Sequence, residues 1–64
     1  MAPILGEHQA WEPGDRCYSV VILGKHGEVI KVYPGLRCCL VVWDGHIEAH
    51  RVAWRALGYL GKAR

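Results

Sequence analysis

Three ionisable side chains alternate with apolar ones in the stretch HIEAHR, residues 46–51. On a β-strand, His46, Glu48 and His50 would project from one face, because successive side chains point to opposite sides. Imidazole and carboxylate groups bind metals and transfer protons. However, two positions four residues apart on a strand lie ~13 Å apart, too far to bind one ion together. No Cys-x-x-Cys pair adds ligands, so we expect no metal site and interpret this face as solvated.

A proton-transfer role for Glu48 and His50 would need a pocket that shifts their pKa values and orients them. One chain of 64 residues has little room for such a pocket, whereas a symmetric oligomer with a central pore would have it. Nucleophiles are scarce, since Ser19 is the single serine, threonine is absent and the cysteines lie in apolar runs that disfavour a thiolate. We predict no catalytic residue and no cofactor, and the pore enzyme stays open as an alternative.

Basic and aromatic residues offer a second kind of chemistry. The chain has eight Lys and Arg against six Asp and Glu, a mild net charge of +2. Cationic side chains neutralise phosphates, and aromatic rings stack on bases. Lys31 and Arg51 fall at outward strand positions, which suits either this role or simple solubility. We predict that DNA or RNA binds to a surface formed by Arg16, Lys31, Tyr33, Arg37, Arg51, Trp54 and Arg55.

The elements that position these residues are short strands. Three runs rich in β-branched and aromatic residues end at glycine or proline and predict strands at 16–23, 28–33 and 37–43. Asp44-Gly45 then predicts a two-residue hairpin turn into a fourth strand, HIEAHR, with Ile47 and Ala49 inward. The stretch VAWRALGYL predicts one helical turn and a last short strand.

The run at 37–43 is apolar on both faces. So small a domain has one core, so the second face must meet the N-terminal arm or another chain. We predict that Cys39, Val41 and Trp43 form this second face and contact another subunit or protein, because interfaces are enriched in aromatic residues. The alternative is that the arm folds back and Trp11 covers the face.

Length and composition favour one small domain, with an arm at 1–13, a barrel at 14–60 and a frayed basic tail at 61–64. Because so short a chain buries a marginal core, we expect a homodimer or higher oligomer. Three cysteines, two of them adjacent, do not make a disulfide framework. No apolar run approaches ~18 residues and no signal peptide is evident, so we expect a cytoplasmic protein without membrane contact.

Five short strands with glycine at several corners predict a small, strongly bent antiparallel barrel. The segments GDRC, HGEVIKV, LVVWDGH and RVAWRAL, between Pro13 and Leu60, resemble the SH3-like small β-barrel group. The resemblance implies an all-β, SH3-like five-stranded antiparallel barrel with a short helical turn before the last strand. Many unrelated functions use this barrel, so the fold does not specify one.

Within that group the chain is similar to the plasmid-borne type-B dihydrofolate reductases, which also run from a Gly-Asp-Arg start to a Val-Ala turn. Those tetramers line an active pore with Val-Gln-Ile-Tyr-Pro, whereas the matching positions here, 47–51, read Ile-Glu-Ala-His-Arg. The resemblance supports a barrel and an oligomer and argues against reductase activity. We therefore predict a small non-enzymatic binding module, a nucleic-acid-binding regulator or accessory protein. The alternatives are a protein-interaction module using the Trp43 face and a pore enzyme using Glu48 and His50.

Overall fold

The computed structural model describes residues 6–62, which form one five-stranded antiparallel sheet and three 3₁₀ turns. The strands are β1 (Asp15–Ser19), β2 (His26–Tyr33), β3 (Cys38–Trp43), β4 (Ala49–Ala53) and β5 (Leu57–Lys62). The turns are η1 (Gly6–His8), η2 (Pro34–Leu36) and η3 (Trp54–Ala56). The predicted all-β class, the five antiparallel strands and the helical turn before the last strand are confirmed. No helix within residues 6–62 is long and apolar enough to cross a membrane.

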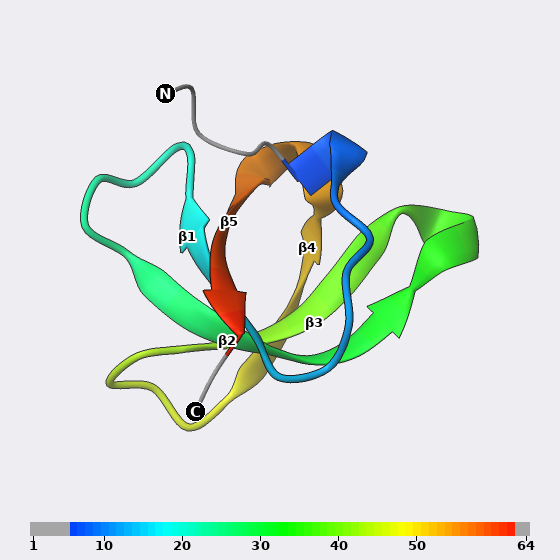
Figure 1. The fold of residues 1–64 in the computed structure, drawn as a ribbon. Coiled ribbons are helices and arrows are strands. Elements are labelled where there is room, and N and C mark those ends of the chain that lie inside the picture. The colour runs from blue at the N-terminus through cyan, green and yellow to red at the C-terminus, as the bar shows by residue number, and fades with distance from the viewer. Residues whose placement is uncertain (1–5, 63–64) are drawn as a thin grey trace.

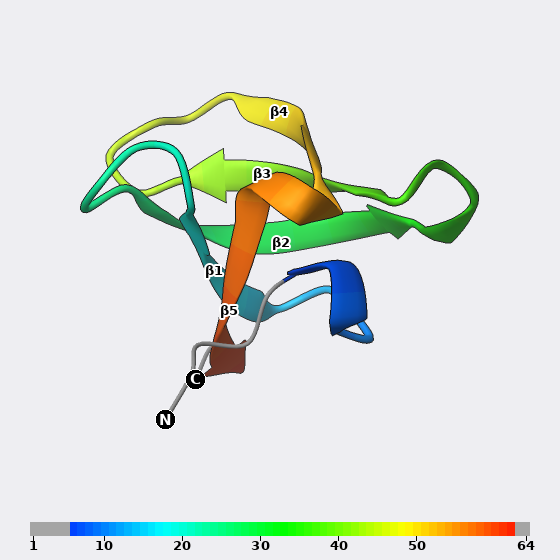
Figure 2. The same ribbon diagram turned by 90° about the horizontal axis from the view of Figure 1, so that it is seen from above.

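The sheet has the strand order β4-β3-β2-β1-β5, so β1 lies between its sequence neighbour and the last strand. Figure 2 shows β2, β3 and β4 running side by side, with β1 and β5 crossing them at a steep angle. In Figure 1 the two end strands, β4 and β5, stand facing each other across the bent sheet. This bend lets one small sheet cover both sides of its own core.

Among residues 6–62 the core is formed by seven buried apolar residues, which are Trp11, Cys17, Val29, Cys39, Val41, Trp43 and Leu57. Trp11 joins them because the segment after η1 folds back over the sheet. Its ring meets Tyr59 edge to face, with centroids 5.8 Å apart, and its indole Nε1 donates to the carbonyl of Gly6 at 2.9 Å. Part of the predicted N-terminal arm therefore belongs to the folded domain, while residues 1–5 of that arm lie outside the described residues.

The inner face of β3 corrects the predicted interface. Cys39 and Val41 are 0% exposed and Trp43 is 6% exposed. Burial in the chain's own core leaves these three side chains no surface for a second protein. The alternative in which Trp11 shares this face agrees with the buried cluster. The outer face of the strand is half-buried instead and consists of Cys38, Leu40 and Val42.

Burial raises the pKa of the Cys17 and Cys39 thiols to about 11. A thiol in an unfolded chain titrates near ~8.5. Between these values the unfolded chain releases protons that the folded chain keeps, so the free energy of unfolding falls as pH rises. We expect the urea midpoint to be level below pH ~8 and to drop above pH ~9. The double variant Cys17→Ala/Cys39→Ala should lose part of this drop, and a midpoint independent of pH would contradict buried, protonated thiols.

The first predicted strand ends earlier than its β-branched residues suggested. β1 stops at Ser19, and the next residues form a loop. The Ser19 hydroxyl accepts hydrogen bonds from the backbone N–H of Val21 at 3.2 Å and of Ile22 at 3.0 Å. Such local side-chain bonds compete with a strand ladder. The strand propensity of the run VVIL is therefore overridden, and all four side chains are exposed.

The predicted two-residue turn at Asp44-Gly45 forms, but the prediction that a paired strand follows it directly is wrong. The His46 N–H donates to the Trp43 carbonyl at 3.0 Å, which closes a turn, yet the first paired residues are Val42 and Ala49. A two-residue type I′ turn needs positive φ at both central positions. Only Gly45, with φ of 86°, has it, so the chain leaves the turn unpaired. β4 starts three residues later than predicted, and Ile47 and Ala49 are exposed rather than inward.

The last strand extends into the predicted basic tail. Gly61 pairs with Arg16 and Lys62 pairs with Asp15. The Asp15 carboxylate is fully buried, with Oδ1 2.9 Å from the Lys62 ammonium, and its Oδ2 accepts from the Glu12 N–H at 2.8 Å. Lys62 also contacts the Glu12 carboxylate. These bonds tie the start of β1 to the end of β5, and the tail's last residues, 63 and 64, lie outside the described residues.

Candidate nucleic-acid interface

A bulge in β2 decides which of its side chains face solvent. Val29 pairs with Val41 and Lys31 pairs with Leu40, so Ile30 is an extra residue in this strand. In a regular strand Val29 and Lys31 would share a face, since residues two apart point the same way. The extra residue reverses the alternation. Val29 is therefore buried in the core while Lys31 stands on the outer face.

Two neighbouring rows of side chains on this outer face contain predicted binding residues. Lys31 pairs with Leu40, which pairs with Arg51, so two cations flank one apolar residue. The next row runs from Tyr33 through Cys38 to Ala53. The Lys31 Nζ lies 5.4 Å from the centre of the Tyr33 ring, which links the rows. Three predicted binding residues from two different strands, Lys31, Tyr33 and Arg51, thus lie together.

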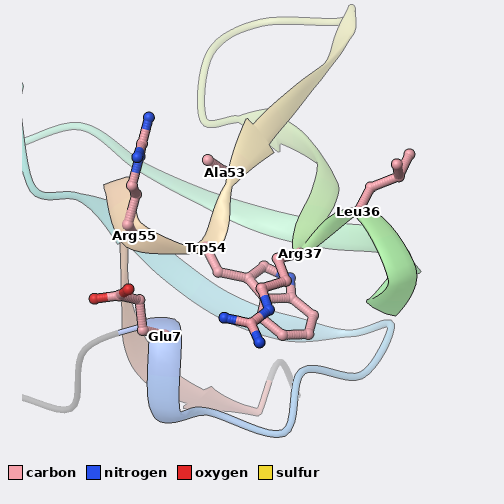
Figure 3. A pocket seen from close by; sticks show the side chains of 6 residues that line it. All are labelled: Glu7, Leu36, Arg37, Ala53, Trp54 and Arg55. Atoms are coloured by element: carbon pink, nitrogen blue, oxygen red, sulfur yellow. The ribbon is translucent and has the colours of Figure 1, made fainter.

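A pocket of about 340 Å³ lies beside the second row, which it meets at Ala53. In Figure 3 the Arg37 side chain crosses in front of the Trp54 indole, and Arg55 lies on the left with its guanidinium pointing away. Arg37 follows η2 and Arg55 lies in η3, so two different elements contribute a basic residue to the pocket lining. The residues that line it are Glu7, Leu36, Arg37, Ala53, Trp54 and Arg55.

The backbone fixes Arg37 and Trp54 relative to each other. Arg37 adopts a left-handed conformation, with φ of 50° and ψ of 48°, and its N–H donates to the Pro34 carbonyl at 3.1 Å. Its own carbonyl accepts from the Trp54 N–H at 2.9 Å. Trp54 is half-buried and packs against the core. The pocket is therefore assembled on ordered backbone rather than on a free loop.

Arg16 is separated from the other predicted binding residues. Its guanidinium forms two hydrogen bonds with the Asp44 carboxylate, at 3.0 and 2.5 Å. This pairing raises the pKa of Arg16 and lowers the pKa of Asp44. The charge of Arg16 is thus compensated within the chain. The structure thus places Lys31, Tyr33 and Arg51 on the outer face and Arg37, Trp54 and Arg55 at the pocket, and it leaves Arg16 apart from both groups.

Three of the six acidic residues form ion pairs away from these cations. Asp44 pairs with Arg16, while Glu12 and Asp15 pair with Lys62. Among residues 6–62, no ion pair involves the four cations of the outer face and the pocket, which are Lys31, Arg37, Arg51 and Arg55. These four cations therefore outnumber the acidic groups near them, which are Glu7 in the pocket lining and Glu28 in the neighbouring row of the outer face.

Glu7 is a site residue that sequence reasoning missed. It enters the pocket because Gly6 lets η1 approach η3 closely. A Cβ atom at position 6 would lie 2.0 Å from the Trp54 carbonyl oxygen, so only glycine permits this approach. The contact joins distant parts of the chain, and a lone glycine in an unpatterned segment is not a specific signal for it.

The histidine and glutamate stretch does not form the predicted face. His46 and Glu48 lie in the loop before β4, His50 lies on β4, and all three side chains are exposed. Within the part of the chain that the structure describes, no three His, Cys, Asp or Glu side chains are grouped so that they could hold a metal ion.

Comparison of the chain with protein-family models, curated proteins and solved structures finds no match.

Proposed function

We propose that this protein is a small non-enzymatic nucleic-acid-binding module that acts as a regulator or accessory factor. Its binding surface, which we call the basic face, consists of Lys31, Tyr33, Arg37, Arg51, Trp54 and Arg55. The observation that carries the proposal is the bulge in β2, which places Lys31 in one row with Arg51 beside Tyr33. We also assign the sheet to the SH3-like small barrels, an assignment supported by its strand order and by the 3₁₀ turn between β4 and β5.

The chemistry of the basic face fits a phosphate backbone with exposed bases. Lys31 and Arg51 neutralise phosphates across the sheet, and Arg37 and Arg55 do the same at the pocket. Tyr33 and Trp54 provide rings on which bases stack, which requires no particular base. Contacts of this kind give binding with low sequence specificity. A cytoplasmic location belongs to the same proposal and is supported by the three free cysteines.

The test is fluorescence anisotropy of labelled mixed-sequence DNA and RNA, single-stranded and duplex, on protein whose mass has been checked by light scattering. Four phosphate contacts predict a log–log salt slope of about −3.6 for duplex DNA and about −2.8 for a single strand. Between 50 and 200 mM salt, a duplex should therefore lose about a hundredfold in affinity. Absence of saturable binding at the lower salt concentration would refute the proposal.

The same titration separates this function from the alternatives. An apolar protein contact is nearly insensitive to salt, whereas phosphate binding is not. The Trp43 face is no longer a candidate surface, because its side chains are buried. A pore enzyme built on Glu48 and His50 has no specific support, since these exposed side chains belong to a loop and a strand rather than to one face.

A further inference from the structure

Exposed apolar side chains gather at one end of the molecule. The β1–β2 loop carries Val20, Val21, Ile22 and Leu23, which are 44%, 79%, 53% and 102% exposed, and Ile47 in the β3–β4 loop is 98% exposed. Figures 1 and 2 both show these two loops protruding at the same end of the sheet, opposite η2. We call the two loops, residues 20–25 and 44–48, the apolar end.

The β1–β2 loop holds these side chains in a fixed arrangement. The Ser19 N–H donates to the Lys25 carbonyl at 2.8 Å, and the Lys25 N–H donates to the Ile22 carbonyl at 3.3 Å. The Val20 N–H donates to the Ala56 carbonyl at 3.0 Å, which anchors the loop to η3. With the two bonds to the Ser19 hydroxyl, the loop presents its apolar side chains on an ordered backbone. A group of exposed apolar side chains held on an ordered backbone is typical of an interaction site.

The apolar end has both a projection and a hollow. The hollow has a volume of about 470 Å³ and is lined by Tyr18, Ser19, Val20, Val21, Leu23, Gly24 and His26. Ile22 is absent from this lining and is 53% exposed on the same loop. A surface that carries a projection beside a matching hollow can pair with itself about a two-fold axis, each copy filling the other. We propose that the apolar end binds a second copy of this chain, with Ile22 of each protomer seated in the hollow of its partner.

Two of the charged groups at this end already have partners within their own chain, while Glu48 is exposed and has no ion pair among the described residues. Asp44 is paired with Arg16, and the Lys25 ammonium lies 5.0 Å from the centre of the Trp43 ring. Both charges thus have favourable contacts within their own chain, which lowers the cost of removing water from the surface. The basic face contributes none of the residues of the apolar end, so pairing leaves it free.

The available area also suits a dimer. A standard interface covers roughly 800 Å² per partner. The whole surface of this chain is 4535 Å², so such an interface would take about a sixth of it. The eleven residues of the two loops, most of them exposed, represent a comparable share of the described chain. A core of only seven buried apolar residues adds a reason, because dimerisation would bury apolar surface that the single chain leaves in water.

Sedimentation equilibrium from about 1 µM to 1 mM tests the dimer. We expect the wild-type mass to rise to twice the 7.2 kDa of one chain, and Ile22→Asp to remain monomeric. The matched control is Leu36→Asp, which introduces the same charge at a 66% exposed apolar residue at the opposite end and should still dimerise. Unchanged tryptophan fluorescence would show that both variants are folded.

Three results would overturn the proposal. The first is a wild-type monomer over the whole concentration range, and the second is an Ile22→Asp variant that still dimerises. The third is a wild-type monomer that binds vesicles of anionic phospholipid through the apolar end, which would assign this surface to a membrane. The dimer does not depend on the nucleic-acid proposal, because its measurement contains no nucleic acid.

Discussion

Replacing Lys31 and Arg51 together by glutamine is expected to weaken nucleic-acid binding by roughly tenfold or more at physiological salt. These two side chains flank Leu40 on the outer face, and among the described residues no ion pair holds either of them. Loss of two phosphate contacts should also reduce the magnitude of the salt slope by about 1.8 for duplex DNA. Anisotropy titrations at several salt concentrations measure both quantities.

The chain offers a closely matched control for this experiment. Lys25 resembles Lys31 in type and setting, because its ammonium lies 5.0 Å from a Trp43 ring centre while that of Lys31 lies 5.4 Å from Tyr33. Lys25, however, belongs to the apolar end. Lys25→Gln should bind nearly as the wild type, and Lys31→Gln alone should bind more weakly. Equal losses in the two single variants would mean that binding follows net charge and not the basic face.

Replacing Trp43 by alanine is expected to remove a large part of the protein's free energy of unfolding. The side chain is 6% exposed within the core, and removal of a buried large aromatic residue costs about 3–5 kcal/mol. A chain of this length is expected to have a total stability of only ~3–10 kcal/mol, from ~0.05–0.15 kcal/mol per residue. Urea denaturation followed by circular dichroism should therefore show an early or absent folded baseline.

The same experiment separates a core position from a docking position. Leu36→Ala is the control, because Leu36 is 66% exposed, lies outside the apolar end, and its removal should change stability by less than about 0.5 kcal/mol. If Trp43 were a contact residue on the surface, its alanine variant would keep the wild-type urea midpoint and lose only a partner. A midpoint unchanged within error would therefore contradict the burial of Trp43.

The strand pattern could be predicted where side-chain type and burial agree. β3 is a continuous apolar run and starts one residue later than predicted, and the turn before the last strand follows from the break in the apolar pattern. The prediction that VVIL continues the first strand was wrong. Apolar, β-branched residues favour a strand, but two hydrogen bonds to the Ser19 hydroxyl stabilise a loop here. The sequence alone does not indicate whether these loop hydrogen bonds or those of a strand ladder are stronger.

The candidate site was predicted in composition but not in arrangement. Lys31 and Arg51 are recognisable as outward residues from their charge alone. The bulge that turns Lys31 away from Val29 depends on the pairing with β3, which is a contact between strands. The separation of Arg16 from the other predicted residues also depends on a long-range contact, because its partner Asp44 lies 28 residues away. Side chains reveal what a surface can bind, whereas long-range pairing decides which of them share it.

The position of β1 between β2 and β5 also has a consequence for the order of assembly. β2, β3 and β4 follow one another in the sequence and pair as neighbours, so they need to close only short loops. β1 meets β5 only when the two ends of the domain come together, and Glu12 and Lys62 are 50 residues apart. Closing so long a loop carries the largest entropy cost in the fold. During synthesis the central meander can therefore pair early, while the buried carboxylate of Asp15 waits for Lys62, at the end of the last strand, before it has its counter-ion.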